Sequence, residues 1–195
     1  MPSEGADSGR DSRPQAGERS LALPARLRAL VQEFPKVWGW FALSGCIALA
    51  DQASKFAILA SMRPGEVREI TGFFNLVLVF NKGAAFSFLA QAQGWQTGFF
   101  IAVASIASVV LTVLLLRHPG RTLLCAGMAL ILGGALGNLW DRAAYGEVVD
   151  FLDLHAFGWH WPAFNVADSA ISTGAALLIL ESFTHREGPA DAPRG

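Results

Sequence analysis

Four long apolar segments dominate this sequence and restrict the folds that it can adopt. They cover residues 37–59, 96–116, 122–140 and 166–183. A run of about 20 mostly apolar residues is long enough for a helix to cross about 30 Å of hydrocarbon. Only 16% of the 195 residues are charged, whereas soluble domains carry about 25%. We therefore expect an all-α membrane protein with four transmembrane helices.

Lys and Arg are unevenly distributed between the two sides of such a bundle. Four crossings place both termini on one side, and most of the basic residues lie in the two tails or, as Arg117 and Arg121, in the link between the second and third segments. Cytoplasmic loops carry an excess of Lys and Arg, so both termini are expected in the cytoplasm. The tryptophans fall at or beyond the segment ends, where interfacial aromatics belong: Trp38, Trp40, Trp95, Trp140, Trp159 and Trp161.

The regions outside the apolar segments differ in character. Residues 1–36 are rich in Gly, Ser, Pro, Arg and acids, which predicts a disordered cytoplasmic tail, and 184–195 form a second tail. Residues 60–94 contain "FFNLVLVF", whose aromatic and β-branched residues predict one or two short strands lying on the outer surface. Residues 141–165 are expected to form another outer loop.

The segment "LSGC" at residues 43–46 permits a different interpretation, because it resembles the cleavage box of a bacterial lipoprotein precursor. Apolar sequence continues past Cys46, which favours a membrane span. With Cys125 also in an apolar run, the two cysteines are interpreted as small buried residues and not as a disulfide framework.

Polar residues inside the apolar segments are the main candidates for function. An ionisable side chain near the bilayer centre costs at least about 2.5–3.5 kcal/mol on insertion scales. With cytoplasmic termini, these residues and their polar neighbours outside the segments, Asn81 in the outer loop and Asp150 after the third segment, lie toward the outer face. The full set is Asp51, Lys55, Asn81, Asn138, Asp141, Arg142, Asp150 and Asp168. We expect them to meet at one depth.

Helical spacing gives a purely structural explanation for some residues in these segments. Asp51 and Lys55 lie four residues apart and are predicted to form a neutralising structural pair. Gly133 and Gly137 have the spacing of small residues that allow close helix packing. Structural roles explain both spacings, and neither requires a catalytic function.

Asp150 and Asp168 support a sharper hypothesis. Two carboxyls held close in a poorly hydrated site cannot both ionise cheaply, so one keeps its proton. The pair then supplies a general base and a general acid, as in aspartic proteases. The alternative is that both residues cap helices, since Asp168 precedes an apolar helical run.

Other chemistries have weaker support. Ser87, Ser169 and Ser172 lack a convincing base. His155 and His160 lie near Asp153 in a Trp-rich loop, where a zinc site would need a further ligand. Neither a metal nor another cofactor is expected.

Four blocks of sequence give a resemblance to a known family. They are "DQASK" (51–55), "NKGAAFSF" (81–88), "GGALGNLWDRAAYGEVVDF" (133–151) and "FNVADSAI" (164–171). In this order they resemble bacterial lipoprotein signal peptidase, also called signal peptidase II.

The resemblance implies a cytoplasmic-membrane aspartic endopeptidase with four transmembrane helices and a small extracytoplasmic β-sheet cradle. It would cleave prolipoprotein signal peptides before a diacylglyceryl-modified cysteine, without a cofactor, and globomycin-type cyclic peptides would inhibit it. Membrane lipids are expected partners, nucleic acid is not, and the chain is expected to act as a monomer. By motif, Asp150 and Asp168 would be the catalytic pair. The supporting residues would be Asp51, Gln52, Lys55, Asn81, Gly83, Asn138, Asp141, Arg142 and Asn165.

Two other classes of function remain open from the residues alone. A small proton-coupled transporter would use the carboxylates as a relay and would carry acids through the membrane thickness. A non-catalytic scaffold would use the aspartates as caps, with consequences for stability only.

Overall fold

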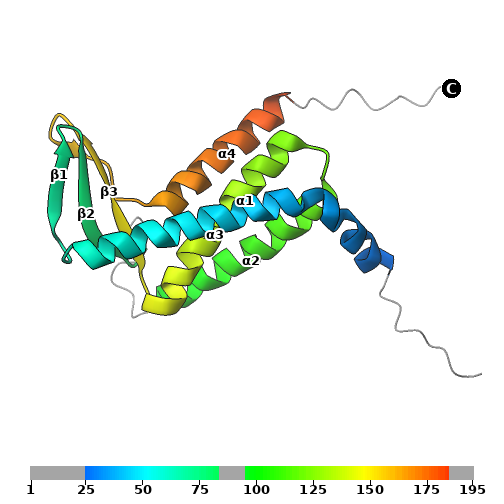
Figure 1. Cartoon of the computed structure of the whole chain (residues 1–195), viewed down its shortest axis with the longest axis horizontal. Coiled ribbons are helices and arrows are strands. Elements are labelled where there is room, and N and C mark those ends of the chain that lie inside the picture. The colour runs from blue at the N-terminus through cyan, green and yellow to red at the C-terminus, as the bar shows by residue number, and fades with distance from the viewer. Residues whose placement is uncertain (1–24, 84–94, 185–195) are drawn as a thin grey trace, which may run out of the picture.

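The computed structural model describes residues 25–83 and 95–184, with side chains from Val37 onward. Figure 1 shows four long helices with a small sheet at one end. The helices are α1 (Ala25–Ser61), α2 (Trp95–Arg117), α3 (Thr122–Tyr145) and α4 (Val166–Thr184). All four are long and apolar enough to cross a membrane, with the span in α1 starting at Val37. The predicted four-helix membrane fold is confirmed.

Two helix boundaries differ from the sequence-based prediction. The first helix begins at Ala25, so residues 25–36, which were assigned to the disordered tail, are helical here. The rest of both predicted tails, 1–24 and 185–195, lies outside the described residues. The helix α3 continues beyond Trp140 to Tyr145 and ends at Gly146, whose φ of 79° provides a left-handed cap. Asp141 therefore belongs to a helix and not to an outer loop.

The sheet contains four strands, β1 (Val67–Thr71), β2 (Phe74–Asn81), β3 (Val148–Ala156) and β4 (Trp159–His160). Neighbouring strands pair antiparallel in the order β1-β2-β3-β4. The first two confirm the strand prediction from "FFNLVLVF". The other two were predicted wrongly as part of a loop. The first four residues of β3 are all buried, so this strand lacks the alternation that marks a half-exposed one.

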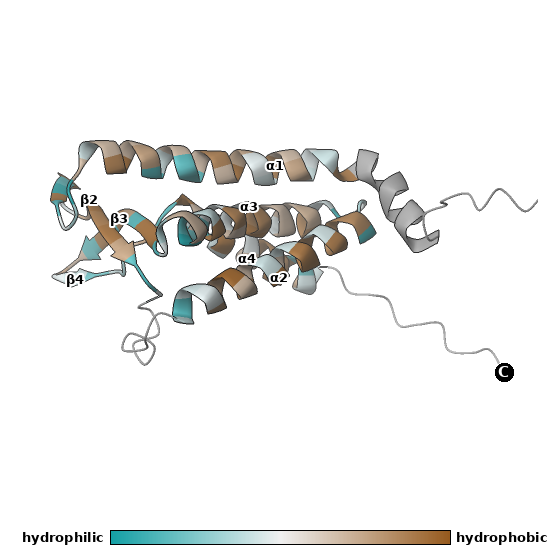
Figure 2. Cartoon of the chain, turned by 90° about the horizontal axis from the view of Figure 1, so that it is seen from below, coloured by the Kyte–Doolittle hydropathy of each residue, from teal (hydrophilic) through white to brown (hydrophobic). Residues whose placement is uncertain are grey.

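The sheet lies at one end of the bundle, where α1 ends and α4 begins (Figure 1). The link between α2 and α3 lies at the opposite end. In Figure 2 the helices are largely apolar along their lengths, while a hydrophilic band interrupts α1 in the half nearer the sheet. This band belongs to the site described below.

Close approach of helices depends on glycines in α3, which contacts the other three helices. A Cβ on Gly133 would lie 2.6 Å from the Ser44 carbonyl oxygen of α1, and one on Gly127 would lie 2.9 Å from the Gly174 carbonyl oxygen of α4. Real side chains do not reach such distances, so α1 and α4 sit as close to α3 as backbone allows. The packing role predicted for Gly133 is confirmed.

An apolar cluster attaches the sheet to the bundle. Ile58 and Met62 near the end of α1 pack with Leu78 of β2 and with Val149 and Phe151 of β3. All five are buried. Because Val149 and Phe151 flank Asp150, this cluster fixes the position of that carboxyl relative to the helices.

Candidate active site

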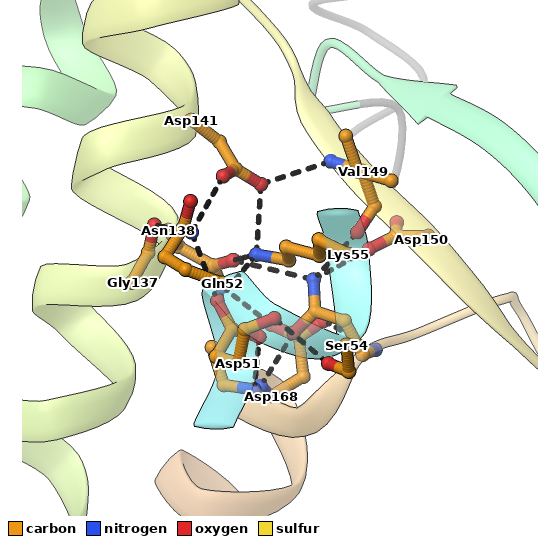
Figure 3. A network of polar contacts seen from close by, with 12 residues as sticks. Asp51, Gln52, Ser54, Lys55, Gly137, Asn138, Asp141, Val149, Asp150 and Asp168 are labelled. Atoms are coloured by element: carbon orange, nitrogen blue, oxygen red, sulfur yellow. Dashed lines mark hydrogen bonds and ion pairs between the residues drawn. The ribbon is translucent and has the colours of Figure 1, made fainter. Parts of the chain in front are cut away.

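Polar side chains from three helices and one strand meet where the bundle joins the sheet (Figure 3). The helices α1 and α3, the strand β3 and the start of α4 each contribute labelled residues to this network. These polar groups come together, as predicted, at the end of the bundle nearer the sheet. One ionisable group is an exception, because the buried Glu181 in α4 pairs with Arg121 at 2.9 Å at the end of the bundle where α2 and α3 are linked.

Lys55 is the cationic centre of the network. Its Nζ lies 2.7 Å from Asp51 Oδ2, 2.7 Å from Asp141 Oδ2 and 2.9 Å from Asn138 Oδ1. The side chain is only 2% exposed. The predicted pair between Asp51 and Lys55 is confirmed, but it is part of a larger cluster. A lysine this deeply buried needs such partners, because an isolated charge is strongly disfavoured there.

Both carboxylates around Lys55 also accept backbone hydrogen bonds from the elements that carry the candidate aspartates. Asp51 Oδ1 accepts from the Ala167 N–H at 2.8 Å, and Asp141 Oδ2 accepts from the Val149 N–H at 3.1 Å. Ala167 precedes Asp168 and Val149 precedes Asp150. The ion cluster thereby fixes α4 and β3 relative to each other.

Gln52 and Gly137 complete the cluster. Gln52 Nε2 donates to Asp141 Oδ1 at 2.8 Å and to the Gly137 carbonyl at 3.1 Å. A Cβ on Gly137 would lie 2.5 Å from Asp51 Oδ2. Sequence reasoning gave Gly137 the same packing role as Gly133, and this was incomplete. Gly137 makes room for a buried carboxylate.

Asp150 lies on β3 and is 1% exposed. Its Oδ1 accepts a hydrogen bond from Asn165 Nδ2 at 2.7 Å, and its Oδ2 accepts one from Asn81 Nδ2 at 2.8 Å. Asn81 is itself oriented, because its Oδ1 accepts from the Gly83 N–H at 2.8 Å. Gly83 has a φ of 96°, a conformation that favours glycine.

Asp168 lies in the first turn of α4. Its Oδ1 accepts from Asn138 Nδ2 at 2.8 Å, and its Oδ2 accepts from the Asn165 N–H at 3.3 Å. In return, Asn165 Oδ1 accepts from the Asp168 N–H at 2.9 Å. This reciprocal arrangement is a capping box. Asp168 therefore makes the capping contact that its position predicts, and this contact does not exclude a catalytic role. Asp150 lies on a strand and caps no helix.

The two aspartates share the asparagines that bind them. Asn165 donates to Asp150 through its side chain and to Asp168 through its backbone. Asn165 Nδ2 also lies 3.2 Å from Oδ1 of Asn138, which binds Asp168. The carboxyls thus lie within one hydrogen-bonded network.

Burial raises the pKa of Asp150 to about 7. The hydrogen bonds from Asn81 and Asn165 oppose the increase, and the neighbouring charge of Asp168 adds to it. A buried carboxyl with a like charge nearby favours its neutral form. Asp150 can therefore hold a proton at neutral pH, as a general acid must.

Arg142 brings a cation to the edge of the network. Its Nη1 donates to the Asn138 carbonyl at 3.3 Å, and its guanidinium carbon lies 5.0 Å from the centre of the Phe100 ring in α2. Stacking on an aromatic ring holds a guanidinium in place. This contact with α2 was not predicted from the sequence.

The histidines form a separate cluster on the sheet. His160 Nδ1 lies 3.0 Å from both carboxylate oxygens of Asp153, and the rings of His155 and His160 stack with centroids 4.9 Å apart. The hydrogen bond from Asn75 to Asp153 anchors the cluster to β2. These residues lie on paired strands, so their assignment to a loop was wrong. Within the described residues, no group of three or more His, Cys, Asp or Glu side chains is arranged to hold a metal.

Comparison with known proteins places this geometry in a family. The family model for signal peptidase (SPase) II matches residues 43–184. The chain belongs to the signal peptidase II family. Cys46, which lies within the continuous helix α1, falls inside this match, so the lipoprotein-precursor interpretation of "LSGC" is excluded.

Individual relatives agree with this assignment. The chain is 52% identical over 149 residues to a lipoprotein signal peptidase of Paraburkholderia phytofirmans, covering 76% of this chain and 87% of that protein. It is 57% identical over 142 residues to one of Ralstonia nicotianae, covering 73% and 82%. A solved bacterial membrane enzyme superposes with a TM-score of 0.68 at 28% identity, covering 76% of this chain and 94% of the other. The chain is therefore a multi-pass membrane peptidase of this family.

Proposed function

We propose that this chain is an aspartic endopeptidase that removes signal peptides from diacylglyceryl-modified prolipoproteins, cutting before the lipidated cysteine. The observation that supports it most directly is the placement of Asp150 and Asp168 in one amide network at the sheet end of the bundle. Membership of the signal peptidase II family supports the substrate class.

In the proposed reaction, a water molecule lies between the two carboxyls. The ionised carboxylate takes a proton from the water, and the resulting hydroxide oxygen bonds to the peptide carbonyl carbon. The protonated carboxyl donates a hydrogen bond to the carbonyl oxygen as negative charge develops there. Collapse of the tetrahedral intermediate breaks the C–N bond, and the departing amine leaves with a proton from the carboxyl pair. The products are a carboxylic acid, which then ionises, and an amine, and no covalent enzyme intermediate forms.

The amides have a positioning role in this proposal. Asn81, Asn138 and Asn165 donate to the two aspartates and so fix their carboxyl planes. The buried cluster around Lys55 holds β3 and α4 together, because its two carboxylates bind the Val149 and Ala167 N–H groups. A geometry fixed before substrate arrives lowers the reorganisation needed in the transition state.

The proposed orientation follows from charge and depth. With both termini in the cytoplasm, the sheet and the aspartates lie at the outer leaflet of the bacterial cytoplasmic membrane. A signal helix with its lipidated cysteine at that surface then meets the carboxyls while its lipid chains stay in the bilayer. We further propose that the monomer is active and that globomycin-type cyclic peptides compete with the substrate.

The experiment is incubation of the purified chain in detergent with a diacylglyceryl-modified prolipoprotein, followed by mass spectrometry of the products. The expected result is one cut, directly before the modified cysteine, that globomycin suppresses. The unmodified precursor serves as the matched control and should be cut much more slowly. Absence of cleavage, or cleavage that depends on an added metal ion, would contradict the proposal.

A further inference from the structure

A groove leads away from Asp168 along α4. It has a volume of about 380 Å³ and is lined on one side by α4 and on the other by the sheet and the segment that follows it. Asp168, Ser169, Ser172 and Thr173 form the α4 wall. Leu154, Trp161 and Phe164 form the opposite wall. The groove is thus polar on one side and apolar on the other.

The polar wall is a stripe along one face of a membrane-spanning helix. Ser172 lies four residues after Asp168, and Thr173 lies four residues after Ser169, so these side chains share a face. At 1.5 Å per residue, Ser172 lies about 6 Å further along the helix axis than Asp168. With Asp168 at the outer end of α4, this direction leads toward the centre of the bilayer.

The three hydroxyls differ in what they already bind. Ser169 donates to the Asn165 carbonyl at 2.9 Å, and Thr173 donates to the Ser169 carbonyl at 2.8 Å. Ser172 makes no hydrogen bond to the described part of the chain, and it is exposed in the groove. Its O–H is a free donor, while the oxygens of Ser169 and Thr173 keep lone pairs that can accept.

A peptide substrate that enters as a membrane helix needs hydrogen-bond donors and acceptors for its backbone. Cleavage requires an extended backbone, and a segment unwound before the cut loses its internal hydrogen bonds. The last four carbonyls of a helix have no partner within it. In the hydrocarbon region each unsatisfied backbone group costs several kcal/mol. A free hydroxyl donor beside the proposed catalytic carboxyl meets this need.

We propose that the Ser169–Ser172–Thr173 stripe binds the unwound backbone of the signal peptide just before its cleavage site. This inference rests on the proposed function and adds the residues that hold the substrate backbone. Ser172 donates to a peptide carbonyl, while Ser169 and Thr173 accept from peptide N–H groups. The apolar wall contacts the substrate side chains that point away from α4. Ser172 and Thr173 are positioning residues in this proposal, because they hold the substrate backbone and take no part in bond breaking.

The test compares Ser172→Ala and Thr173→Val with Ser182→Ala, using the full chain and a diacylglyceryl-modified prolipoprotein. Ser182 is the matched control, because it is an exposed serine on α4 whose hydroxyl binds the Ile179 carbonyl far from the groove. Loss of one neutral hydrogen bond should lower kcat/KM about 3- to 10-fold in Ser172→Ala, with apparent Tm unchanged. Ser182→Ala should match the wild type, and Ser172→Thr, which keeps the hydroxyl, should restore activity.

The outcomes separate two failures. If Ser172→Ala and Thr173→Val both cleave as fast as Ser182→Ala, the stripe does not bind substrate, while the proposed function stands. If Ser172→Thr is as slow as Ser172→Ala, side-chain shape and not the hydroxyl is responsible, which also overturns the inference. If the wild type itself fails to cleave, the proposed function fails and this inference fails with it.

Discussion

At the scale of single residues, Asp150 and Asp153 show how environment separates two aspartates of one strand. Burial raises the pKa of Asp150 to about 7. Burial alone would raise the pKa of Asp153 as well. The hydrogen bonds with His160 and Asn75 outweigh that effect, so the pKa of Asp153 lies below its ordinary value. Asp153 is thus a fixed anion in the sheet, whereas Asp150 can change its protonation state near neutral pH.

This difference predicts the pH dependence of cleavage. Because the pKa of Asp150 is raised to about 7, its proton is present below that pH and is lost as the pH rises through it. If one protonated carboxyl is required, kcat/KM should fall on the alkaline side with an apparent pKa near 7. A pH series with lipidated substrate checks this, and Asp153→Asn should show the same alkaline limb. A rate that stays constant from pH 6 to about 9 would contradict the role of this proton.

At the scale of helices and strands, the sequence identified the elements with strong periodic or apolar signals and missed those defined by tertiary contact. Four apolar runs sufficed for the helices. The strand β3 was missed because its first residues are buried on both faces between β2 and the bundle. Proximity of Asp150 and Asp168 to common asparagines depends on that strand, so sequence spacing suggested the pair but not its arrangement. Ser172 was considered only as a nucleophile, because its groove exists only once the sheet packs beside α4.

The contact between α1 and α3 provides a prediction at this scale. A Cβ on Gly137 would lie 2.5 Å from Asp51 Oδ2, so Gly137→Ala must displace the carboxylate that binds Lys55. Overpacking of this kind costs about 1–3 kcal/mol, and activity should fall because the N-terminus of α4 shifts. Apparent Tm and kcat/KM in detergent are the measurements. The control is Gly98→Ala in α2, where a Cβ meets open space. Equal stability and activity in both variants would contradict the arrangement.

At the scale of the whole molecule, the fold places its candidate catalytic residues at one end of a membrane bundle. The sheet and the candidate aspartates lie at one end, and the link with Arg117 and Arg121 lies at the other. Positive charge near the link favours the cytoplasm. This distribution agrees with the proposed orientation, in which the sheet end of the bundle faces the outer surface.

Labelling of introduced cysteines tests this orientation. In a Cys46→Ala background, whose remaining thiol, Cys125, is buried, Gly72→Cys places a thiol in the turn between β1 and β2, and Gly120→Cys places one between α2 and α3. A Cβ meets open space at both positions. A membrane-impermeant maleimide applied outside an intact inner membrane should label the first and not the second, and permeabilised membranes should allow both. The reverse pattern would place the sheet in the cytoplasm.

The most direct measurement of the central claim is single-turnover cleavage of a lipidated prolipoprotein by Asp150→Asn, Asp168→Asn and Asp153→Asn. Loss of a general acid or base slows a reaction about 100- to 10,000-fold. The first two variants should show at least this loss while keeping the apparent Tm needed for a folded bundle. Asp153→Asn removes a carboxylate from the same strand outside the site and should keep most of the activity. Folded Asp150→Asn or Asp168→Asn protein that cleaves at the wild-type rate would contradict the two-carboxyl mechanism.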